Sequence, residues 1–236
     1  MRTNNQIYLL REINIDYWYK KNQYFTDQSL HDSTKIHLGI MQGKGFLKDY
    51  NPKSNHEIVC DIESSIFQYR TGNRDKLLFI FDLIQCWGGK MGKGPYVRVD
   101  RTTGAIYRNT AEYWVSNYEA GVQEGITIDE ALNHLCNIPM VGVSFATKHL
   151  MFWHRAPIFD TRMQLLMFGG IAPRRFNDFR DGIRELAAHW KVEDILVERG
   201  LFAFSENFFS NDRLTFKGLV EDQTDLSVAK SLAAQD

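Results

Sequence analysis

Two charged side chains, Lys148 and Asp160, stand twelve positions apart in a stretch that is dominated by apolar residues. Pro157 lies between them and interrupts any continuous helix. A charge taken out of water costs free energy unless it is paired or has a chemical task. A neutral amine can attack as a nucleophile, and a carboxylate can stabilise a developing positive charge. The two residues therefore predict either a structural ion pair or a catalytic site.

The segment before the lysine predicts a helix, a sharp turn and a second helix. Thr127 and Glu130 have the spacing of a capping box, in which each side chain bonds the backbone of the other residue. A helix is therefore expected from about Thr127 to Cys136. The next helix should begin after Pro139 and end near Trp153, so that it carries the lysine.

Asp160 stands where the N-cap of a further helix is expected. An aspartate at an N-cap accepts a hydrogen bond from a backbone N–H of the first helical turn. The apolar residues after it predict a helix that ends at Gly169 and Gly170, because glycine readily adopts the left-handed conformation common at helix C-termini. The lysine and the aspartate should therefore belong to two successive helices.

Most of the other patterns are also helical. Apolar residues recur at spacings of three and four between Asn55 and Trp87, which predicts two helices, the second ending at the glycines after Trp87. Further helices are expected over residues 175–190 and 192–209. Residues 96–108 alternate between apolar and polar around a glycine, which predicts one small β-hairpin or an extended loop. We therefore predict a mostly α fold.

The composition is that of an ordinary globular protein. Of the 236 residues, 44% are hydrophobic and 24% are charged, with a formal net charge of −1. A chain of this length can form one large domain, and we predict a single domain over residues 1–236, built as two interlocked helical lobes. Because the net charge is close to zero, a polyanion would have to be bound through a local patch.

The sequence predicts no metal site and no disulfide framework. The three cysteines, Cys60, Cys86 and Cys136, are far apart and form no CxxC pair. The seven histidines lack a metal-binding spacing with aspartate or glutamate. His149 and His154, which flank the predicted end of the lysine-bearing helix, are assigned to the polar surface or to the edge of a pocket.

No membrane association is predicted either. The longest strongly apolar run, Leu77 to Phe81, is far shorter than the roughly 20 residues of a transmembrane helix. The apolar stretch near the N-terminus is too short for a signal peptide. We expect a cytoplasmic protein that acts as a monomer and uses no cofactor.

The turn before the lysine-bearing helix has a recognisable sequence. Ile138–Ala146 reads IPMVGVSFA and resembles the pattern L-P-G-V-G-x-x-x-A of the helix-hairpin-helix DNA glycosylase superfamily, with Met140 in place of a glycine. In that family a loop of the form V-P-V-D follows, and Ala156–Asp160 reads APIFD, with one extra residue between proline and aspartate. The helix-hairpin-helix would cover about residues 128–153, and the local pattern is most similar to the 8-oxoguanine DNA glycosylase branch.

The resemblance implies a role for each of several residues. Backbone N–H groups of the hairpin and the following helix N-terminus would bind a DNA phosphate without needing net positive charge. These residues are Val141, Gly142, Val143 and Ser144. Arg162 would contact a second phosphate, and Asp160 would be the catalytic carboxylate that faces the sugar.

A flipped base also needs a pocket with stacking surfaces. The aromatic residues assigned to that base pocket are Trp153, Phe204 and Phe208.

The resemblance leaves two roles open for Lys148. Family members that cut the strand carry a lysine two residues after the last glycine of the hairpin, where this chain has Ser144. Lys148 lies one helical turn later and should share a face with that position. It would be either the nucleophile, which the apolar helix face slightly favours, or a residue that recognises the base.

The implied function is a DNA glycosylase, without a metal, that flips a damaged or modified base out of double-stranded DNA and excises it. AP lyase activity would follow if Lys148 attacks the sugar. The enzyme would serve repair of an 8-oxoguanine-like lesion or defence against phage DNA that carries a modified base. The alternative is a non-catalytic helix-hairpin-helix module for DNA binding or interaction, in which Asp160 would only cap a helix.

Overall fold

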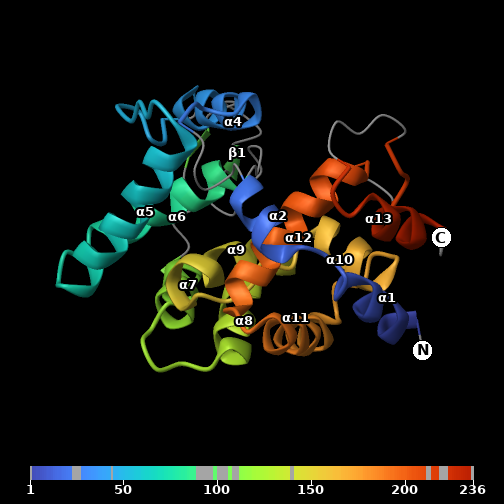
Figure 1. The fold of residues 1–236 in the computed structure, drawn as a ribbon. Coiled ribbons are helices and arrows are strands. Elements are labelled where there is room, and N and C mark those ends of the chain that lie inside the picture. Colours follow the sequence, from blue (N-terminus) through green and yellow to red (C-terminus); the bar gives the residue numbers. More distant parts are fainter. Residues whose placement is uncertain are drawn as a thin grey trace. The chain divides into compact units, whose positions relative to one another are not determined.

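The computed structural model describes residues 2–22, 28–43, 45–88, 98–99, 106–107, 112–138, 141–210, 214–217 and 223–234. Its regular structure is mostly α-helical, as predicted (Figure 1). The chain divides into two compact units. Unit 1 combines Met1–Gln23 with Ala156–Asp236, and unit 2 is Tyr24–Arg155. None of the described helices is long and apolar enough to cross a membrane.

Unit 2 contains the predicted helix-hairpin-helix segment. Its elements are α4 (Asp32–Gly43), α5 (Asn55–Arg70), α6 (Lys76–Trp87), β1 (Arg98–Val99), β2 (Ile106–Tyr107), α7 (Glu112–Gly121), α8 (Ile128–Cys136) and α9 (Val143–His154). The short strands β1 and β2 pair antiparallel, which confirms the prediction of a small hairpin.

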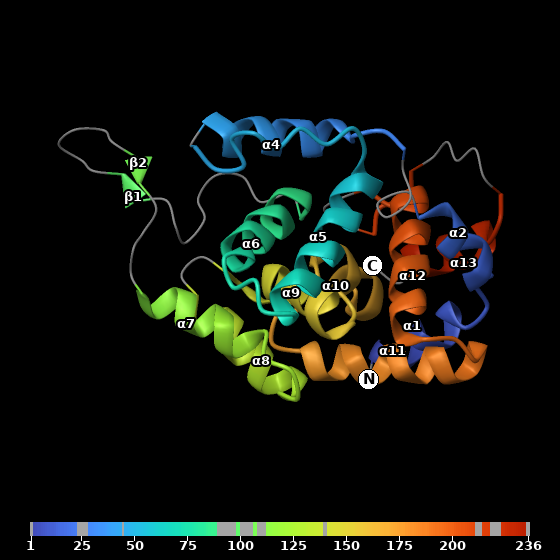
Figure 2. The ribbon, with the colours of Figure 1, turned by 90° about the vertical axis from the view of Figure 1, so that its left-hand side faces the viewer.

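The centre of unit 2 is the helix pair α5 and α6, which lie side by side (Figure 2). Ser54 caps α5 by accepting a hydrogen bond from the N–H of Glu57, and Ile58, Ile62 and Ile66 turn one apolar stripe inward. Helix α6 is buried almost all round and ends at Trp87, as predicted from the glycines that follow. Such a helix must be covered by neighbours on every side, and α4, α5 and α9 pack against it.

The predicted boundaries around α8 and α9 are confirmed. Thr127 and Glu130 form the capping box, with the N–H of Glu130 donating to the Thr127 hydroxyl over 3.3 Å and the N–H of Thr127 donating to the Glu130 carboxylate over 3.2 Å. Helix α9 ends at Arg155, whose φ of 54° is left-handed. Pro139 and Met140, at the tip of the predicted hairpin, lie outside the described residues.

Unit 1 is built from both ends of the chain. Its helices are α1 (Arg2–Leu10), α2 (Ile15–Lys21), α10 (Thr161–Phe168), α11 (Phe176–Trp190), α12 (Asp194–Phe208) and α13 (Leu226–Ala233). The helices predicted over residues 175–190 and 192–209 correspond to α11 and α12. Their apolar faces meet those of α1, α2 and α10.

The closest packing in unit 1 joins α2 to α12. Trp18 is buried, and its indole lies edge-on to the rings of Phe204 and Phe208 at centroid distances of 5.6 Å and 5.5 Å. A Cβ on Gly200 would lie only 2.5 Å from Ile15, so the absence of a side chain there allows the two helices to touch. The indole N–H of Trp18 donates to the Asp225 carboxylate over 2.7 Å, which also connects α2 to the start of α13.

Candidate functional site

The N-terminus of α9 presents open backbone N–H groups. Gly142 is the exposed N-cap, and its carbonyl accepts from the N–H groups of Phe145 and Ala146, both over 2.9 Å. The N–H groups of Gly142, Val143 and Ser144 have no acceptor in the part of the chain that the structure describes. Adjacent N–H groups at the positive end of a helix are suited to an anion such as a phosphate.

Val141 is less available than the sequence suggested. Its N–H donates to the carbonyl of Ile138 over 3.0 Å, and its side chain is buried. The backbone groups open to an anion are therefore those of the three residues after it.

Substitution at Gly142 separates anion binding from folding. An added Cβ would meet nothing within 4 Å, and the φ of −85° is ordinary, so Gly142→Val should fold at a cost of about 1 kcal/mol for the weaker N-cap. The branched side chain would keep a phosphate away from the amide groups. We expect the affinity for duplex DNA, measured by fluorescence anisotropy, to fall roughly ten-fold for every sequence tested, since hydrogen bonds to charged groups are lost.

A second glycine provides the control for this variant. Gly170 lies in unit 1, and a Cβ there also meets nothing within 4 Å. Gly170→Val should leave DNA affinity unchanged. An unchanged affinity in a folded Gly142→Val protein would show that the start of α9 has only a structural role.

Lys148 lies about one and a half turns after Gly142 along α9, and its side chain extends to the C-terminal end of α6. Its Nζ donates to the carbonyl oxygen of Gly88 over 2.6 Å and lies 4.6 Å from the centroid of the Phe145 ring. The C-terminal end of a helix carries partial negative charge, which stabilises an ammonium group there. A Cβ on Gly88 would lie 2.8 Å from Lys148 Cδ, so the lysine stem packs directly on this glycine.

Asp160 is the N-cap of α10, as predicted. Its Oδ1 accepts from the N–H of Met163 over 3.0 Å, and the side chain is half-buried. Its Oδ2 has no hydrogen-bond partner among the described residues. The cap bond holds the carboxylate at the positive end of α10 while leaving one oxygen for another group.

The guanidinium of Arg162 makes contacts within unit 1. Its Nη1 donates to the carbonyl of Ser205 over 3.0 Å, and the guanidinium lies 5.6 Å from the ring centroid of Phe202. The arginine therefore ties α10 to α12. A phosphate contact would have to be made by its remaining N–H groups.

The structure places the predicted site residues in two groups. Gly142, Ser144 and Lys148 belong to α9 of unit 2. Asp160 and Arg162 belong to the start of α10 in unit 1.

The three aromatic residues assigned to a base pocket are core residues. Trp153 is 3% exposed and belongs to the interior of unit 2, whereas Phe204 and Phe208 are fully buried in unit 1. Their rings pack against other aromatic side chains of their own units. They offer no open face for stacking, and their apolar character is explained by core packing.

His149 was assigned to a polar surface or pocket edge, and this assignment is wrong. The residue is fully buried, and its ring stacks on Phe81 at a centroid distance of 4.8 Å. Its Nε2 lies 2.9 Å from Gln85 Nε2, and its Nδ1 lies 3.1 Å from the hydroxyl of Tyr118. The same hydroxyl accepts the indole N–H of Trp153 over 2.9 Å.

This buried polar network connects α6, α7 and α9 through side chains that are far apart in sequence. Burial, with a smaller contribution from nearby Lys148, lowers the pKa of His149 to about 3. Burial also raises the pKa of Tyr118. Both groups are therefore neutral at physiological pH, which avoids the cost of a charge inside a buried network. His154 is half-buried, its Nε2–H donates to the Gly121 carbonyl over 2.9 Å, and its pKa is lowered by burial.

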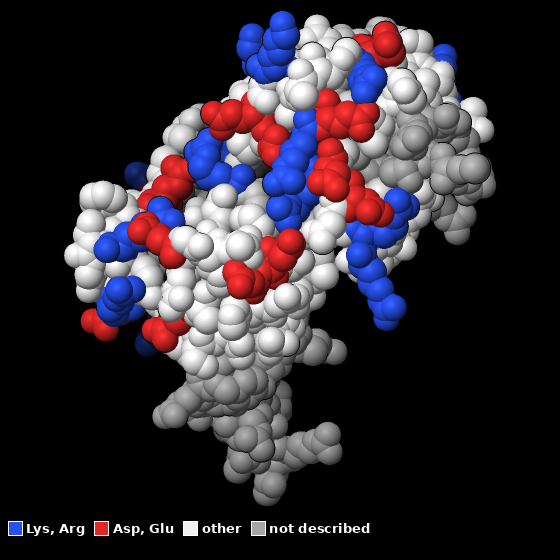
Figure 3. All heavy atoms as spheres, turned by 90° about the horizontal axis from the view of Figure 1, so that it is seen from below, with Lys and Arg blue, Asp and Glu red and all other residues white. Residues whose placement is uncertain are grey.

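The surface charge is mixed. On the face drawn in Figure 3, basic and acidic side chains alternate over short distances and form no extended basic surface. Some opposite charges are paired locally, as in the ion pair of Arg175 with Asp178 at 2.7 Å at the start of α11. A face with mixed charge provides no broad positive field for a polyanion, so local backbone N–H groups are the better candidates for binding one.

The three cysteines form no disulfide among the described residues. Cys60, Cys86 and Cys136 are all free, and Cys86 is buried with its thiol pKa raised to about 12, mainly by burial. Among the described residues there is no cluster of three histidine, cysteine, aspartate or glutamate side chains that could hold a metal.

Comparisons of the chain with protein families, curated proteins and solved structures gave no match. The candidate site is therefore defined by its own geometry and by the motif in the sequence.

Proposed function

We propose that this protein is a DNA glycosylase that flips a damaged or modified base out of the duplex and cleaves its N-glycosidic bond. The base would leave with the bonding electron pair, and the sugar would develop positive charge at C1′. The Asp160 carboxylate would stabilise that charge and orient the attacking water. The water oxygen would form the new bond to C1′, and the proton that the water loses would neutralise the departing base. The open N–H groups at the start of α9 would bind a phosphate of the same strand.

The observation that supports this proposal best is the state of the Asp160 side chain. One carboxylate oxygen is fixed by the cap bond to Met163, and the other has no partner in the described part of the chain. A carboxylate that only capped a helix would be equally well served by asparagine or serine. A module that only bound DNA would gain nothing from a negative charge near the phosphates. A fixed and partly open carboxylate is what stabilisation of a sugar cation requires.

Lys148 is proposed to remain an ammonium group, so that water is the nucleophile. Its contact with the Gly88 carbonyl at the end of α6 favours the charged form, whereas a nucleophilic amine must be neutral. The product would then be an intact strand with an abasic site. In the second route Lys148 attacks C1′ itself, forms a Schiff base and permits strand cleavage.

The direct test is a panel of duplex oligonucleotides, each with one modified base, incubated with the full-length protein. Release of the free base is measured by mass spectrometry, and strand breakage is measured with and without alkali. Base release followed by alkali-dependent breakage supports the proposal with water as nucleophile. DNA binding without release of any base would identify the protein as a binding module.

Covalent trapping distinguishes the two routes. We expect that borohydride, added during turnover, does not link the protein to DNA, because Lys148 is held as an ammonium. Lys148→Gln should then change the preference among modified bases more than the rate. A covalent complex that is lost in Lys148→Gln, together with base release, would instead assign the nucleophile to this lysine.

Gly88→Ala tests the position of the lysine without removing it. The new methyl would lie 2.8 Å from Lys148 Cδ, 2.9 Å from the carbonyl oxygen of Ile84 and 3.1 Å from Phe145, so the lysine and the end of α6 must both shift. Gly39→Ala is the matched control, since a Cβ on Gly39 meets nothing within 4 Å. We expect Gly88→Ala to reproduce the altered base preference of Lys148→Gln, and Gly39→Ala to match the wild type.

A further inference from the structure

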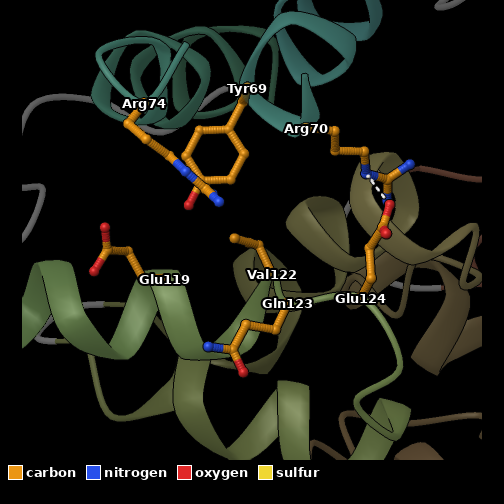
Figure 4. A pocket seen from close by; sticks show the side chains of 7 residues that line it. All are labelled: Tyr69, Arg70, Arg74, Glu119, Val122, Gln123 and Glu124. Atoms are coloured by element: carbon orange, nitrogen blue, oxygen red, sulfur yellow. Dashed lines mark ion pairs between the residues drawn. The ribbon is translucent and has the colours of Figure 1, made fainter. Parts of the chain in front are cut away.

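A cavity of about 200 Å³ opens on unit 2, between the end of α5 and the end of α7 (Figure 4). Tyr69 and Arg70 come from the last turn of α5, and Arg74 lies in the connection to α6. Across the cavity lie Glu119 of α7 and the residues that follow that helix, Val122, Gln123 and Glu124. None of these residues belongs to the candidate site described above, which consists of residues at the start of α9 and at the start of α10.

Arg70 and Glu124, which line one side of the cavity, are held in place by contacts within unit 2. Arg70 forms an ion pair with Glu124 at 3.0 Å, and it also donates to the carbonyl of Trp153 over 2.9 Å. Arg70 and Glu124 thus satisfy each other and do not define the charge preference of the cavity. Val122 is buried and gives the cavity an apolar floor.

Arg74 forms a flat, positively charged platform. Its guanidinium lies 4.5 Å from the ring centroid of Tyr69, and that ring is itself held edge-on against Trp153 at 5.4 Å. This cation–π contact holds the guanidinium beside the ring, and a guanidinium is itself a planar group on which another planar group can stack. Its side chain makes no hydrogen bond within the described residues, so its N–H edge is available as well.

Glu119 provides two hydrogen-bond acceptors on the opposite side. Glu119 lines the cavity from α7, and Figure 4 shows it on the side of the cavity across from Arg74, with Val122 between the two helices. As with Arg74, this carboxylate has no hydrogen bond or ion pair in the part of the chain that is described. The cavity therefore offers a cationic plane on one side and an unpaired pair of acceptor oxygens on the other.

We infer that this cavity binds a nucleobase with the donor pattern of guanine. A neutral planar ring can stack on the Arg74 plane without bringing an uncompensated charge beside Glu119. The pairing edge of guanine has two neighbouring N–H donors, which match the two carboxylate oxygens, and a carbonyl that can accept from a guanidinium N–H. Adenine and cytosine present one amino donor beside an acceptor nitrogen, and thymine presents one N–H between two carbonyls. These bases leave one oxygen of Glu119 unpaired.

The same groups disfavour three other ligand classes. A phosphate would be attracted by Arg74 but repelled by Glu119. A simple cation would be attracted by Glu119 but repelled by Arg74. An amino-acid zwitterion could pair with both charges, but it has no plane to stack on the guanidinium. The inference does not depend on base excision, because a protein that releases no base can still bind one in this cavity.

Titration calorimetry of the full-length protein with free nucleosides tests the inference. Guanosine should bind with a dissociation constant of about 1 mM or lower. The dissociation constants of adenosine, cytidine and thymidine should be roughly ten-fold higher. Glu119→Gln, which is isosteric and replaces one acceptor with a donor, should weaken guanosine binding roughly ten-fold and reduce the preference for guanosine. Arg74→Gln should weaken all four nucleosides, because it removes the common stacking plane.

Glu63→Gln is the matched control, since Glu63 is an exposed carboxylate on α5 of the same unit. It should bind guanosine like the wild type. The inference would be overturned if the protein bound no nucleoside or bound all four equally. It would also be overturned if the preference for guanosine persisted in Glu119→Gln, or if glycine or glutamine bound more tightly than guanosine. The assay contains no DNA, so its failure and a failure to excise bases are separate results.

Discussion

Replacing Asp160 with asparagine is expected to reduce base release at least roughly 100-fold while leaving the fold intact. Asparagine is as good an N-cap as aspartate, so the bond to the N–H of Met163 is kept. The variant loses only the negative charge that we propose to stabilise the sugar cation. Affinity for DNA should stay the same or increase, because a repulsion with the phosphates is removed. Base release under single-turnover conditions and DNA affinity by anisotropy provide the two measurements.

Two further variants separate charge from capping. Asp75 is the exposed N-cap of α6 and makes no side-chain cap bond, so Asp75→Asn removes one carboxylate at an equivalent position and should retain full activity. Asp160→Ala should lose activity and, in addition, about 1 kcal/mol of stability, because the cap is lost. Activity of Asp160→Asn within a few-fold of the wild type would remove this residue from the mechanism.

The buried His149 should make the protein increasingly unstable as the solution is acidified. Its pKa is about 3 in the folded chain, whereas an unfolded histidine titrates near 6.5. Between these values the unfolded state binds one more proton, so the free energy of unfolding decreases as the pH falls. The slope from this residue approaches about 1.4 kcal/mol per pH unit, and the loss is complete below pH 3. Burial also lowers the pKa values of His37 and His154, which adds to the slope just below pH 6.5.

Urea unfolding at a series of pH values between 4 and 7.5 measures this slope. His149→Gln should be less stable than the wild type at pH 7.5, because its side chain cannot make both bonds of the ring, but its stability should depend less on pH. His189→Gln serves as the control, since His189 is exposed and its replacement should leave the slope unchanged. A slope that is the same in wild type and His149→Gln would show that this ring is not the origin of acid sensitivity.

Local patterns were sufficient to predict most of the helices. The capping box of Thr127 and Glu130, the cap at Asp160 and the stop at Gly169 are all contained within a few consecutive residues, and all three were predicted correctly. Helices α5 and α6 were predicted from apolar spacing alone. Helices α1, α2 and α4 were not predicted, because their short segments carry no clear helical pattern. These three helices are stabilised by packing against segments that are distant in sequence.

The roles of single side chains were harder to predict, because their partners are remote in sequence. His149 is a network residue only because Gln85 and Tyr118, 64 and 31 residues earlier, reach its two ring nitrogens. Trp153 was assigned to a pocket from its aromatic character, which is the same for a stacking surface and for a core. The cavity between α5 and α7 had no sequence signal, since Arg74 and Glu119 belong to segments that are brought together only by folding.

The division of the chain also has a consequence for synthesis on the ribosome. Unit 2 is one continuous segment, Tyr24–Arg155, and all the helices that form its core have been translated before unit 1 is complete. Helix α2 is translated early, yet its partner α12 begins only at Asp194. Trp18 must therefore remain without Phe204 and Phe208 until α12 has been translated.

Domains generally fold as units, so unit 2 is expected to fold first on the nascent chain while α1 and α2 stay unpaired. The exposed apolar face of α2 during that interval is a natural target for chaperones that bind nascent chains. Closure of unit 1 then joins segments about 180 residues apart, which makes it a slow, late step for this topology. Mutations in α2 should consequently lower the yield of folded protein in cells more than they lower the stability of protein that has already folded.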